Sequence, residues 1–297
     1  MLDWLRHYKH RAMHNFTITT IKADSSDFLG RFREIVSDPL NLAIERHPLA
    51  GFIEGDSVIL HNGNRVPATG DAAYYGSFSQ ILVINRGVHE PLEEYVFQEV
   101  LKVVSQTPIM LELGAYWGHY SMWLKAKRSQ ASVHMVEPMP LNIKAGKENF
   151  AKNGLQGIFI ESFVGNGHFE VDDYLSKNNI GVLDILHSDI QGYELEMLEG
   201  ATRSLAEQLV TYLFVATHSQ QLHHSVVKKL SDSGYRVEVS SDFDSETTSF
   251  DGFVFASNPS VKPVFTNFTP LNRLQILAST PSEQVQYIAN VIDRKVL

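Results

Sequence analysis

One stretch of the sequence, residues 108–121, constrains the fold more than any other. An apolar segment with the pattern of a buried strand runs into a turn that contains Gly114 and Gly118, and a helix pattern follows. Because glycine lacks a Cβ atom, the backbone can bend sharply after the strand and approach a ligand at the helix N-terminus. The stretch therefore predicts a strand–turn–helix unit that cradles a cofactor in an α/β protein.

The residues inside the turn narrow the class of ligand. A dinucleotide fingerprint needs glycine at positions 114, 116 and 119, because the pyrophosphate lies against bare backbone. Tyr116 and His119 break that pattern, and no phosphate-binding Gly-Lys-Ser or Gly-Lys-Thr follows. Glu112, near the end of the strand, would repel a pyrophosphate but suits a ligand with an ammonium and a sulfonium group, as in S-adenosylmethionine.

A second strand pattern, residues 132–137, also ends in an acid, Glu137. In nucleotide-binding α/β folds such an acid reaches the ribose hydroxyls. Alternatively, Glu137 starts the next helix, where a carboxylate complements the helix dipole. Both roles are compatible with a parallel sheet that binds a nucleoside.

Two later strands carry the candidate catalytic residues. Residues 183–189 predict a buried strand that ends at Asp189, and a helix after Gly192 turns Leu195 and Leu198 inward. Residues 209–217 are a continuous apolar run, typical of a central strand, with His218 directly after it. Because ligands bind at the carboxyl ends of such strands, Asp189 and His218 are predicted to face one cleft.

These motifs resemble those of the FkbM family of S-adenosylmethionine-dependent methyltransferases, over roughly residues 88–257. The family run Asp-x-x-Gly-x-Glu-Leu-x-x-Leu-x-Gly-Ala is matched by Asp189, Gly192, Glu194, Leu195, Leu198, Gly200 and Ala201. The other matches are Gly114-Ala115 with Gly118, Glu137-Pro138 with Asn142, and residues 171–175. Three positions depart from the family pattern: Tyr116 stands where Asn is usual, His187 where Lys is usual and Gln191 where Glu is usual.

The resemblance implies a fold and a cofactor. The expected fold is a Rossmann-like class I methyltransferase sheet of the α/β class, mostly parallel with an antiparallel edge strand, with helices on both faces and a smaller N-terminal α+β region. The expected cofactor is S-adenosylmethionine. The residues assigned to its site are Glu112, Gly114, Ala115, Tyr116, Trp117, Gly118, Glu137, Pro138, Asn142, Ser162, Phe163, Asp189 and Gln191.

The N-terminal region, residues 1–105, is expected to form a substrate wall or a dimer contact. Residues 1–14 predict an amphipathic helix whose three histidines we interpret as solvated rather than metal-binding. Residues 57–66 predict a hairpin that turns at Asn62-Gly63, and residues 81–85 predict a further strand. A helix over roughly residues 92–104, opened by Glu90-Pro91, leads into the methyltransferase domain of residues 106–260.

The end of the chain carries an edge of the sheet and a C-terminal extension, residues 261–297. Residues 235–239 and 252–256 predict an antiparallel edge pair, joined by an acidic loop that we interpret as mobile and solvated rather than calcium-binding. Thr280 and Glu283 form a capping box for a helix that begins at Pro281. Its expected apolar stripe consists of Val285, Ile288, Ala289 and Ile292.

The expected reaction is methyl transfer to a hydroxyl of a sugar or secondary metabolite, as the resemblance implies. A hydroxyl must lose its proton, and His218 and Asp189 are the candidate bases. His218 as an ordinary helix N-cap is an equal alternative, and a divalent ion on Asp189 and Glu194 is less favoured, so no metal is expected. Two other functions stay open: a nicotinamide-dependent oxidoreductase, which Tyr116 and His119 disfavour, and a cofactor-binding module without catalysis.

Composition limits the partners. A net charge of −9 argues against nucleic acid, which needs a basic surface. The chain has no cysteine, which excludes disulfides and fits a cytoplasmic location, and no apolar run reaches the roughly 18 residues that span a membrane. We therefore expect a small-molecule or glycan hydroxyl substrate, no nucleic acid, no membrane, and a homodimer as a reasonable assembly.

Overall fold

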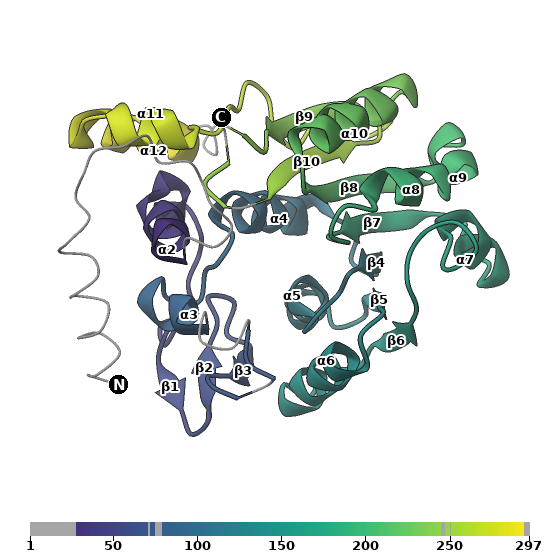
Figure 1. Cartoon of the computed structure of the whole chain (residues 1–297), viewed down its shortest axis with the longest axis horizontal. Helices are drawn as coiled ribbons and strands as arrows, with labels where there is room; N and C mark the ends of the chain where they lie inside the picture. Colours follow the sequence, from purple (N-terminus) through teal and green to yellow (C-terminus); the bar gives the residue numbers. More distant parts are fainter. Residues whose placement is uncertain (1–27, 71, 75–78, 245–246, 250, 294–297) are drawn as a thin grey trace.

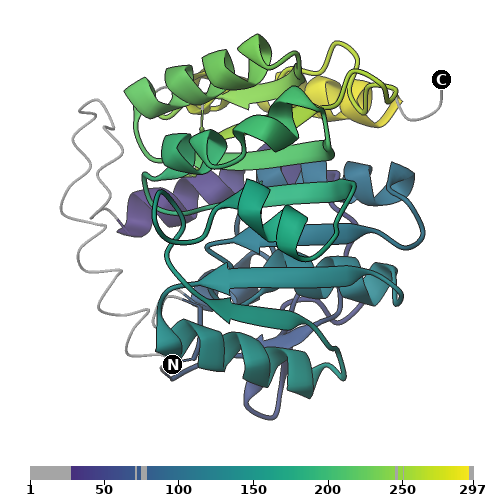
Figure 2. The same ribbon diagram turned by 90° about the vertical axis from the view of Figure 1, so that its right-hand side faces the viewer.

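The molecule is built around a seven-stranded sheet with helices on both sides (Figure 1, Figure 2). The computed structural model describes residues 28–70, 72–74, 79–244, 247–249 and 251–293. The helix predicted over residues 1–14, with its histidines, lies outside the described residues.

The strand order of the large sheet is β6-β5-β4-β7-β8-β10-β9. The strands are β4 (Ile109–Leu113), β5 (Ser132–Glu137), β6 (Ile158–Glu161), β7 (Leu183–Ser188), β8 (Val210–Thr217), β9 (Arg236–Ser241) and β10 (Gly252–Ser257). The first five are parallel, whereas β10 runs antiparallel to both β8 and β9. The predicted sheet, including its antiparallel edge, is confirmed.

Alternate side chains of the buried strands pack into two separate apolar cores. In β8, Tyr212 and Phe214 point to one core, while Leu213 and Val215 point to the other. The helices against the first face are α4 (Pro91–Val103), α5 (His119–Lys127) and α6 (Pro140–Lys152). Those against the second are α7 (Val171–Lys177), α8 (Glu194–Glu199), α9 (Thr202–Ala206) and α10 (Gln220–Asp232). A strand covered on both faces is apolar throughout, which explains the continuous run in β8.

The order of the parallel strands creates a switch point between β4 and β7. The chain proceeds outward from β4 through β5 to β6, and then returns to the other side of β4 as β7. Connections on either side of such a point diverge, so a crevice opens beyond the carboxyl ends of the two strands. Glu112 lies near the end of β4, Asp189 directly follows β7, and Glu137 ends the neighbouring strand β5, as predicted.

A small antiparallel sheet of β1 (Ile53–Glu54), β2 (Ser57–Ile59) and β3 (Arg65–Pro67) precedes the large one. The predicted hairpin is confirmed: Ile59 pairs with Arg65, and the connecting turn includes Gly63 at φ 91°. Around it lie α2 (Phe28–Ser37), the 3-10 helix η1 (Pro39–Leu42) and α3 (Gln80–Ile84).

The strand predicted over residues 81–85 is wrong, because this segment forms α3. Its side chains Ile81 and Leu82 are buried, and Asn85 closes the helix by donating its backbone N–H to Ile81 O at 2.8 Å. A five-residue apolar run has no periodicity that distinguishes a strand from a helical turn.

The C-terminal segment folds back beside the N-terminal helices. It contains α11 (Arg273–Ala278) and α12 (Pro281–Asp293), and α12 contacts η1. The predicted capping box is present, with Glu283 accepting from Thr280 N at 2.7 Å. The predicted apolar stripe is only partly correct, because Ile288 is buried but Val285 is 66% exposed.

In the part of the chain that the structure describes, no helix combines the length and apolar character needed to cross a bilayer.

Candidate functional site

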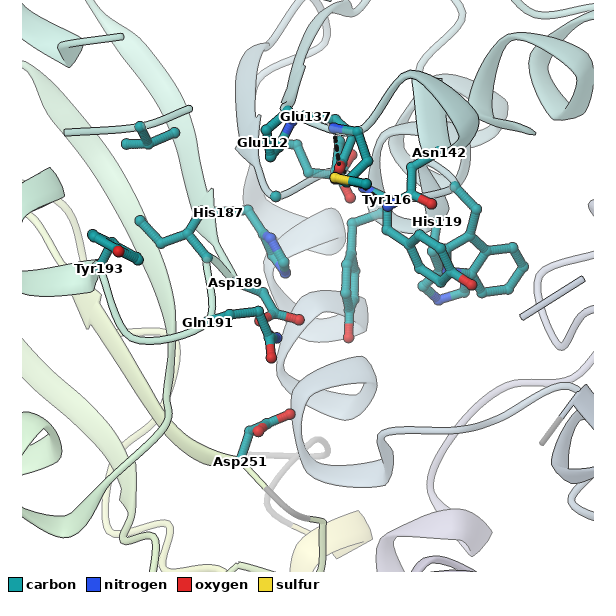
Figure 3. A pocket seen from close by; sticks show the side chains of 18 of the residues that line it. Glu112, Tyr116, His119, Glu137, Asn142, His187, Asp189, Gln191, Tyr193 and Asp251 are labelled. Atoms are coloured by element: carbon teal, nitrogen blue, oxygen red, sulfur yellow. Dashed lines mark hydrogen bonds between the residues drawn. The ribbon is translucent and has the colours of Figure 1, made fainter. Parts of the chain in front are cut away.

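A cavity of about 670 Å³ opens at the switch point of the sheet (Figure 3). Its volume is within the range of about 300–1,000 Å³ that small-molecule sites occupy. The residues that line it are Tyr74, His89, Glu90, Glu112, Gly114, Ala115, Tyr116, Trp117, His119, Tyr120, Glu137, Pro138, Met139, Asn142, Phe163, Val164, His168, His187, Asp189, Ile190, Gln191, Tyr193 and Asp251. Most of the residues predicted to bind the cofactor therefore line this one cavity.

The glycine turn after β4 is fixed by protein packing. Gly114 has φ 73°, and a Cβ atom there would lie 1.7 Å from the carbonyl oxygen of Asp189. Gly118 has φ 78° and faces the ring of Phe150, which a Cβ atom would approach to 2.9 Å. The missing side chains make room for Asp189, directly after β7, and for Phe150 of α6. Gly114 also lines the cavity, and the approach of a ligand to this turn stays a prediction.

Glu137 points into the turn and accepts hydrogen bonds from the turn, from the segment after β5 and from α6. Its Oε2 accepts from Tyr116 N at 3.0 Å, while its Oε1 accepts from Met139 N at 2.9 Å and from Asn142 Nδ2 at 3.1 Å. Glu137 is only 5% exposed and lines the cavity. Each carboxylate oxygen has two lone pairs, so the bonds to the protein leave acceptor capacity toward a ligand. Both roles predicted for this acid, ligand contact and helix start, are compatible with this geometry.

Tyr116 adopts a backbone conformation that favours asparagine or glycine. Its φ is 46°, in the left-handed region, where Asn is several-fold enriched. Its ring lies 6.2 Å from that of Tyr74, between ring centroids, so the side chain reaches toward the N-terminal region. Tyr116, in place of the family's usual Asn, therefore has a less favourable backbone conformation but adds an aromatic contact beside the cavity.

Glu112 is buried against α5. Its Oε2 accepts from Ser121 N at 3.1 Å, and burial raises the pKa of the Glu112 carboxyl. Three predicted site residues, Gly118, Ser162 and His218, do not line the cavity. Ser162 instead donates its hydroxyl to Phe163 O at 2.9 Å, whereas Phe163 itself forms part of the wall.

His218 lies behind the cavity wall among three carboxylates. Its Nε2 is 3.2 Å from Asp189 Oδ1 and 3.4 Å from Asp251 Oδ1, and its Nδ1 is 3.0 Å from Glu194 Oε1. Glu194 is fully buried and also accepts from Ile190 N at 3.1 Å. The N-cap alternative is not observed, because Ser219 caps α10 with its own side chain.

These carboxylates determine the charge of His218. Burial alone would lower the pKa of His218, but bonds to Asp189 and Glu194 and the charge of Asp251 outweigh it and raise the pKa to about 11. Burial would likewise raise the pKa of Asp189, but His218 more than offsets this and lowers it. At neutral pH the pair is therefore an imidazolium and a carboxylate. An imidazolium cannot accept a proton, so these surroundings disfavour His218 as the general base.

A different acid, Glu90, lies beside Asp189 and Asp251, with one carboxylate oxygen from each of the three within 4.8 Å of the others. Its Oε2 accepts from the hydroxyl of Tyr120 at 2.8 Å. Burial raises the pKa of Glu90 to about 7; the charge of His89 opposes the rise, whereas Glu93 and Asp189 add to it. A carboxyl group with a pKa near neutrality inside a cleft is a candidate for acid–base chemistry.

In the sequence, Glu90 carries only the signal of a helix start. It sits directly before Pro91 at the N-terminus of α4, on a segment far from the cofactor motifs in the chain. Its neighbour Glu93 contacts His187, with Oε1 2.5 Å from Nε2. Burial raises the pKa of Glu93 and lowers that of His187. No local pattern signals this role, because tertiary packing of α4 against β7 brings the groups together.

The fold and the cavity define a class of protein. A parallel sheet with a glycine turn after its first strand, an acid after its second and a cleft at the switch point is the arrangement of nucleoside-cofactor enzymes of the Rossmann-like type. The chain belongs to the FkbM methyltransferase family: a family model described as "Methyltransferase FkbM domain" matches residues 88–237. The predicted family and fold are thereby confirmed, and S-adenosylmethionine is the cofactor.

Solved structures of methyltransferases are similar to this chain in fold. A precorrin-6y C5,15-methyltransferase from Geobacter metallireducens gives a TM-score of 0.42 at 15% identity, covering 56% of this chain and 89% of that one. TrmK of M. capricolum, solved with S-adenosyl-homocysteine, gives 0.41 at 14% identity, covering 67% and 84%. Fibrillarin from Aeropyrum pernix gives 0.38 at 15% identity, covering 52% and 67%. No curated protein matches the chain in sequence.

Proposed function

We propose that the protein transfers a methyl group from S-adenosylmethionine to a hydroxyl of a sugar or secondary metabolite. The observation that carries the proposal is the division of one cavity into two chemically different halves. The wall formed by the glycine turn, Glu137 and Asn142 suits a nucleoside, and the wall that contains Glu90 offers a base with a pKa of about 7. Figure 3 displays Glu137 and Asn142 on one side of the cavity and Asp251 on the other.

The first half has the features that a nucleoside cofactor needs. Glu137 presents a buried carboxylate for the ribose hydroxyls, and Asn142 holds its Oε1 in place. Phe163 is 60% exposed and lines the cavity, so its ring is available to stack on a base. When bound, S-adenosylmethionine would supply an electrophilic methyl group, and its sulfur would leave as the neutral thioether of S-adenosyl-homocysteine.

The second half has the features that a hydroxyl acceptor needs. Glu90 accepts the proton that the hydroxyl loses as its oxygen bonds to the methyl carbon, and Tyr120 orients the carboxylate through its 2.8 Å bond. Asp189 stays ionised and lines the cavity, where its charge would stabilise the positively charged end of the cofactor. His218 acts as a positioning residue that fixes this carboxylate from behind. Alignment of the reactants in such a site contributes on the order of 7–11 kcal/mol in the best cases.

Cofactor binding provides the first test. Isothermal titration with S-adenosyl-homocysteine should give micromolar binding, and Glu137→Gln should weaken it by roughly tenfold or more, because hydrogen bonds to a charged group contribute about 1.5–3 kcal/mol. Glu161→Gln is the matched control: Glu161 pairs with Glu137 at the end of the neighbouring strand but is exposed and outside the cavity. Equal affinities for both variants would refute the proposed role of Glu137.

Methyl transfer provides the second test. Protein incubated with methyl-labelled cofactor and a panel of glycans and hydroxylated metabolites should label a hydroxyl oxygen, as located by mass spectrometry. Labelling confined to nitrogen or carbon would refute O-methylation, and cofactor binding without labelling would favour the non-catalytic module. Binding of NADH in a fluorescence titration would instead favour the oxidoreductase. A cytoplasmic location and a homodimer stay predictions.

A further inference from the structure

A buried cluster of two histidines and one glutamate lies next to the acceptor end of the cavity. His61, Glu94 and His119 are 1%, 0% and 2% exposed, and one ligand atom from each lies within 4.8 Å of the others. The three residues come from the N-terminal hairpin region, α4 and α5. Only His119 of the three also lines the cavity, so the cluster sits directly behind the wall.

Glu94 is held at the start of α4 so that its second oxygen faces His61. Its Oε1 accepts from His89 N at 2.8 Å and from Glu90 N at 3.0 Å, which fixes the carboxylate. Its Oε2 is buried and lies 2.8 Å from His61 Nε2, so the carboxylate and the imidazole present these two atoms side by side next to His119.

His119 supplies the second, independent observation. Both of its ring nitrogens are buried, and neither has a hydrogen-bond partner among the residues that the structure describes. A buried polar atom without a partner is destabilising, and a bound ion is one of the few explanations for such an atom in a native protein. The His119 ring is stacked on Trp117 with 5.4 Å between centroids, which holds it in place.

The outer side of the Glu94 carboxylate is held by the protein. Besides the two backbone N–H groups, His89 Nδ1 lies 2.7 Å from Oε1, while Oε2 faces His61. A carboxylate that is oriented in this way from its outer side is typical of a metal ligand.

We propose that His61, Glu94 and His119 form a binding site for a divalent transition-metal ion of the zinc type. Two imidazoles and one carboxylate are a ligand set typical of Zn²⁺ and of non-haem iron, whereas Mg²⁺ and Ca²⁺ prefer oxygen ligands. Glu90, whose Oε2 is 3.7 Å from His89 Nε2, places a second acid near the cluster. The site goes beyond the proposed methyl transfer, which does not require it.

The test is a zinc titration of the full-length protein after removal of metals with a chelator. To exclude competition from the chain end, the parent protein carries glutamine in place of the three histidines at positions 7, 10 and 14. We expect saturable binding of one Zn²⁺ per chain, measured by competition with a chromophoric chelator. Co²⁺ should bind at the same site with a visible absorption band that Zn²⁺ abolishes.

His119→Gln and Glu94→Gln should each lower the zinc affinity by more than roughly 100-fold, because even residues that only orient a ligand contribute about 10–100-fold. His224→Gln is the control, since His224 is exposed on α10. Glutamine at position 94 keeps an acceptor for the N–H groups at the start of α4, and circular dichroism verifies folding.

Three outcomes would overturn the site: no saturable binding by the parent protein, equal affinity of His119→Gln and His224→Gln, or Mg²⁺ displacing Zn²⁺ at comparable concentration. The first outcome assigns the cluster to a buried hydrogen-bonding network. It can be measured on the parent protein alone, so the proposal stays testable even where a variant does not fold. Binding of S-adenosyl-homocysteine is measured separately from zinc binding and should be unchanged by His224→Gln. Failure of the metal site can therefore be distinguished from failure of the methyltransferase proposal.

Discussion

Replacement of Glu90 by Gln should lower activity and raise stability, and the two effects have one cause. The Glu90 side chain is 17% exposed, and burial raises the pKa of its carboxyl from the ordinary 4.5 to about 7. Glutamine retains an oxygen that accepts the hydrogen bond of Tyr120 but cannot accept a proton. Loss of a general base lowers the rate by about 10²–10⁴-fold, so kcat should fall by this factor while binding of S-adenosyl-homocysteine is retained.

The pH profile follows from the same pKa. With a value of about 7, roughly one tenth of Glu90 is ionised at pH 6 and roughly nine tenths at pH 8, so kcat/KM of the wild type should rise between these values. Glu90→Gln should lose this rise. Glu99→Gln, on the same helix and paired with Lys102, should keep both the rate and the profile.

The stability effect has a definite sign. Between pH 4.5 and about 7 the folded protein holds a proton on Glu90 that the unfolded chain has released, so the free energy of unfolding decreases as pH rises through this window. Above pH 7 the free energy of unfolding is lower by at most about 3 kcal/mol, since a pKa difference of one corresponds to about 1.4 kcal/mol. Urea unfolding should therefore find Glu90→Gln more stable than the wild type at pH 8 and equal to it at pH 4. A variant that is less stable at pH 8, or that retains the pH-dependent rise in kcat/KM, would refute the reasoning.

Three further predictions concern the framework of the site. Gly114→Ala should destabilise the fold by roughly 2–5 kcal/mol in urea unfolding, because the new Cβ would meet Asp189 O at 1.7 Å; a loss below the error of the measurement would contradict the packing argument. His218→Gln should cost roughly 3–5 kcal/mol at pH 6, because it removes the positive charge beside Asp189 and Glu194, and the difference from wild type should shrink as pH rises from 6.5 to about 11, where folded His218 loses its proton; a difference independent of pH would exclude the raised pKa. Thr248→Val should cost about 1–3 kcal/mol, since the Thr248 hydroxyl donates to buried Asp38 at 2.7 Å, and no loss in thermal unfolding would show that this bond is replaced by water.

The sequence predicted the sheet well because its signals are local. The glycine turn after residue 113, the acid at 137 and the continuous apolar run of β8 each reflect neighbours along the chain, and the structure places all three as expected. The failure at residues 81–85 has the same origin: five apolar residues are compatible with a strand or with one turn of helix, and only packing against the hairpin distinguishes them.

The acceptor half of the site could not be predicted in this way. Glu90 carries only the signal of a helix start, and His119 is informative in the sequence only because it excludes a dinucleotide fingerprint. His218 was expected to be a base, since an isolated imidazole titrates near neutrality. Its carboxylate neighbours Asp189, Glu194 and Asp251 are spread over the chain, so its charge depends on contacts that no local pattern encodes.

The sequence by itself therefore determined the family, the strand–turn–helix units around Gly114 and Asp189, and the cofactor, because backbone geometry and strand periodicity are properties of short segments. Only the tertiary structure decided which acids share a cavity, which of them keep a proton, and why Gly114 must be glycine. The physical reason is that pKa values and steric contacts depend on burial and on distances between groups, and folding sets these between residues that are far apart in the chain.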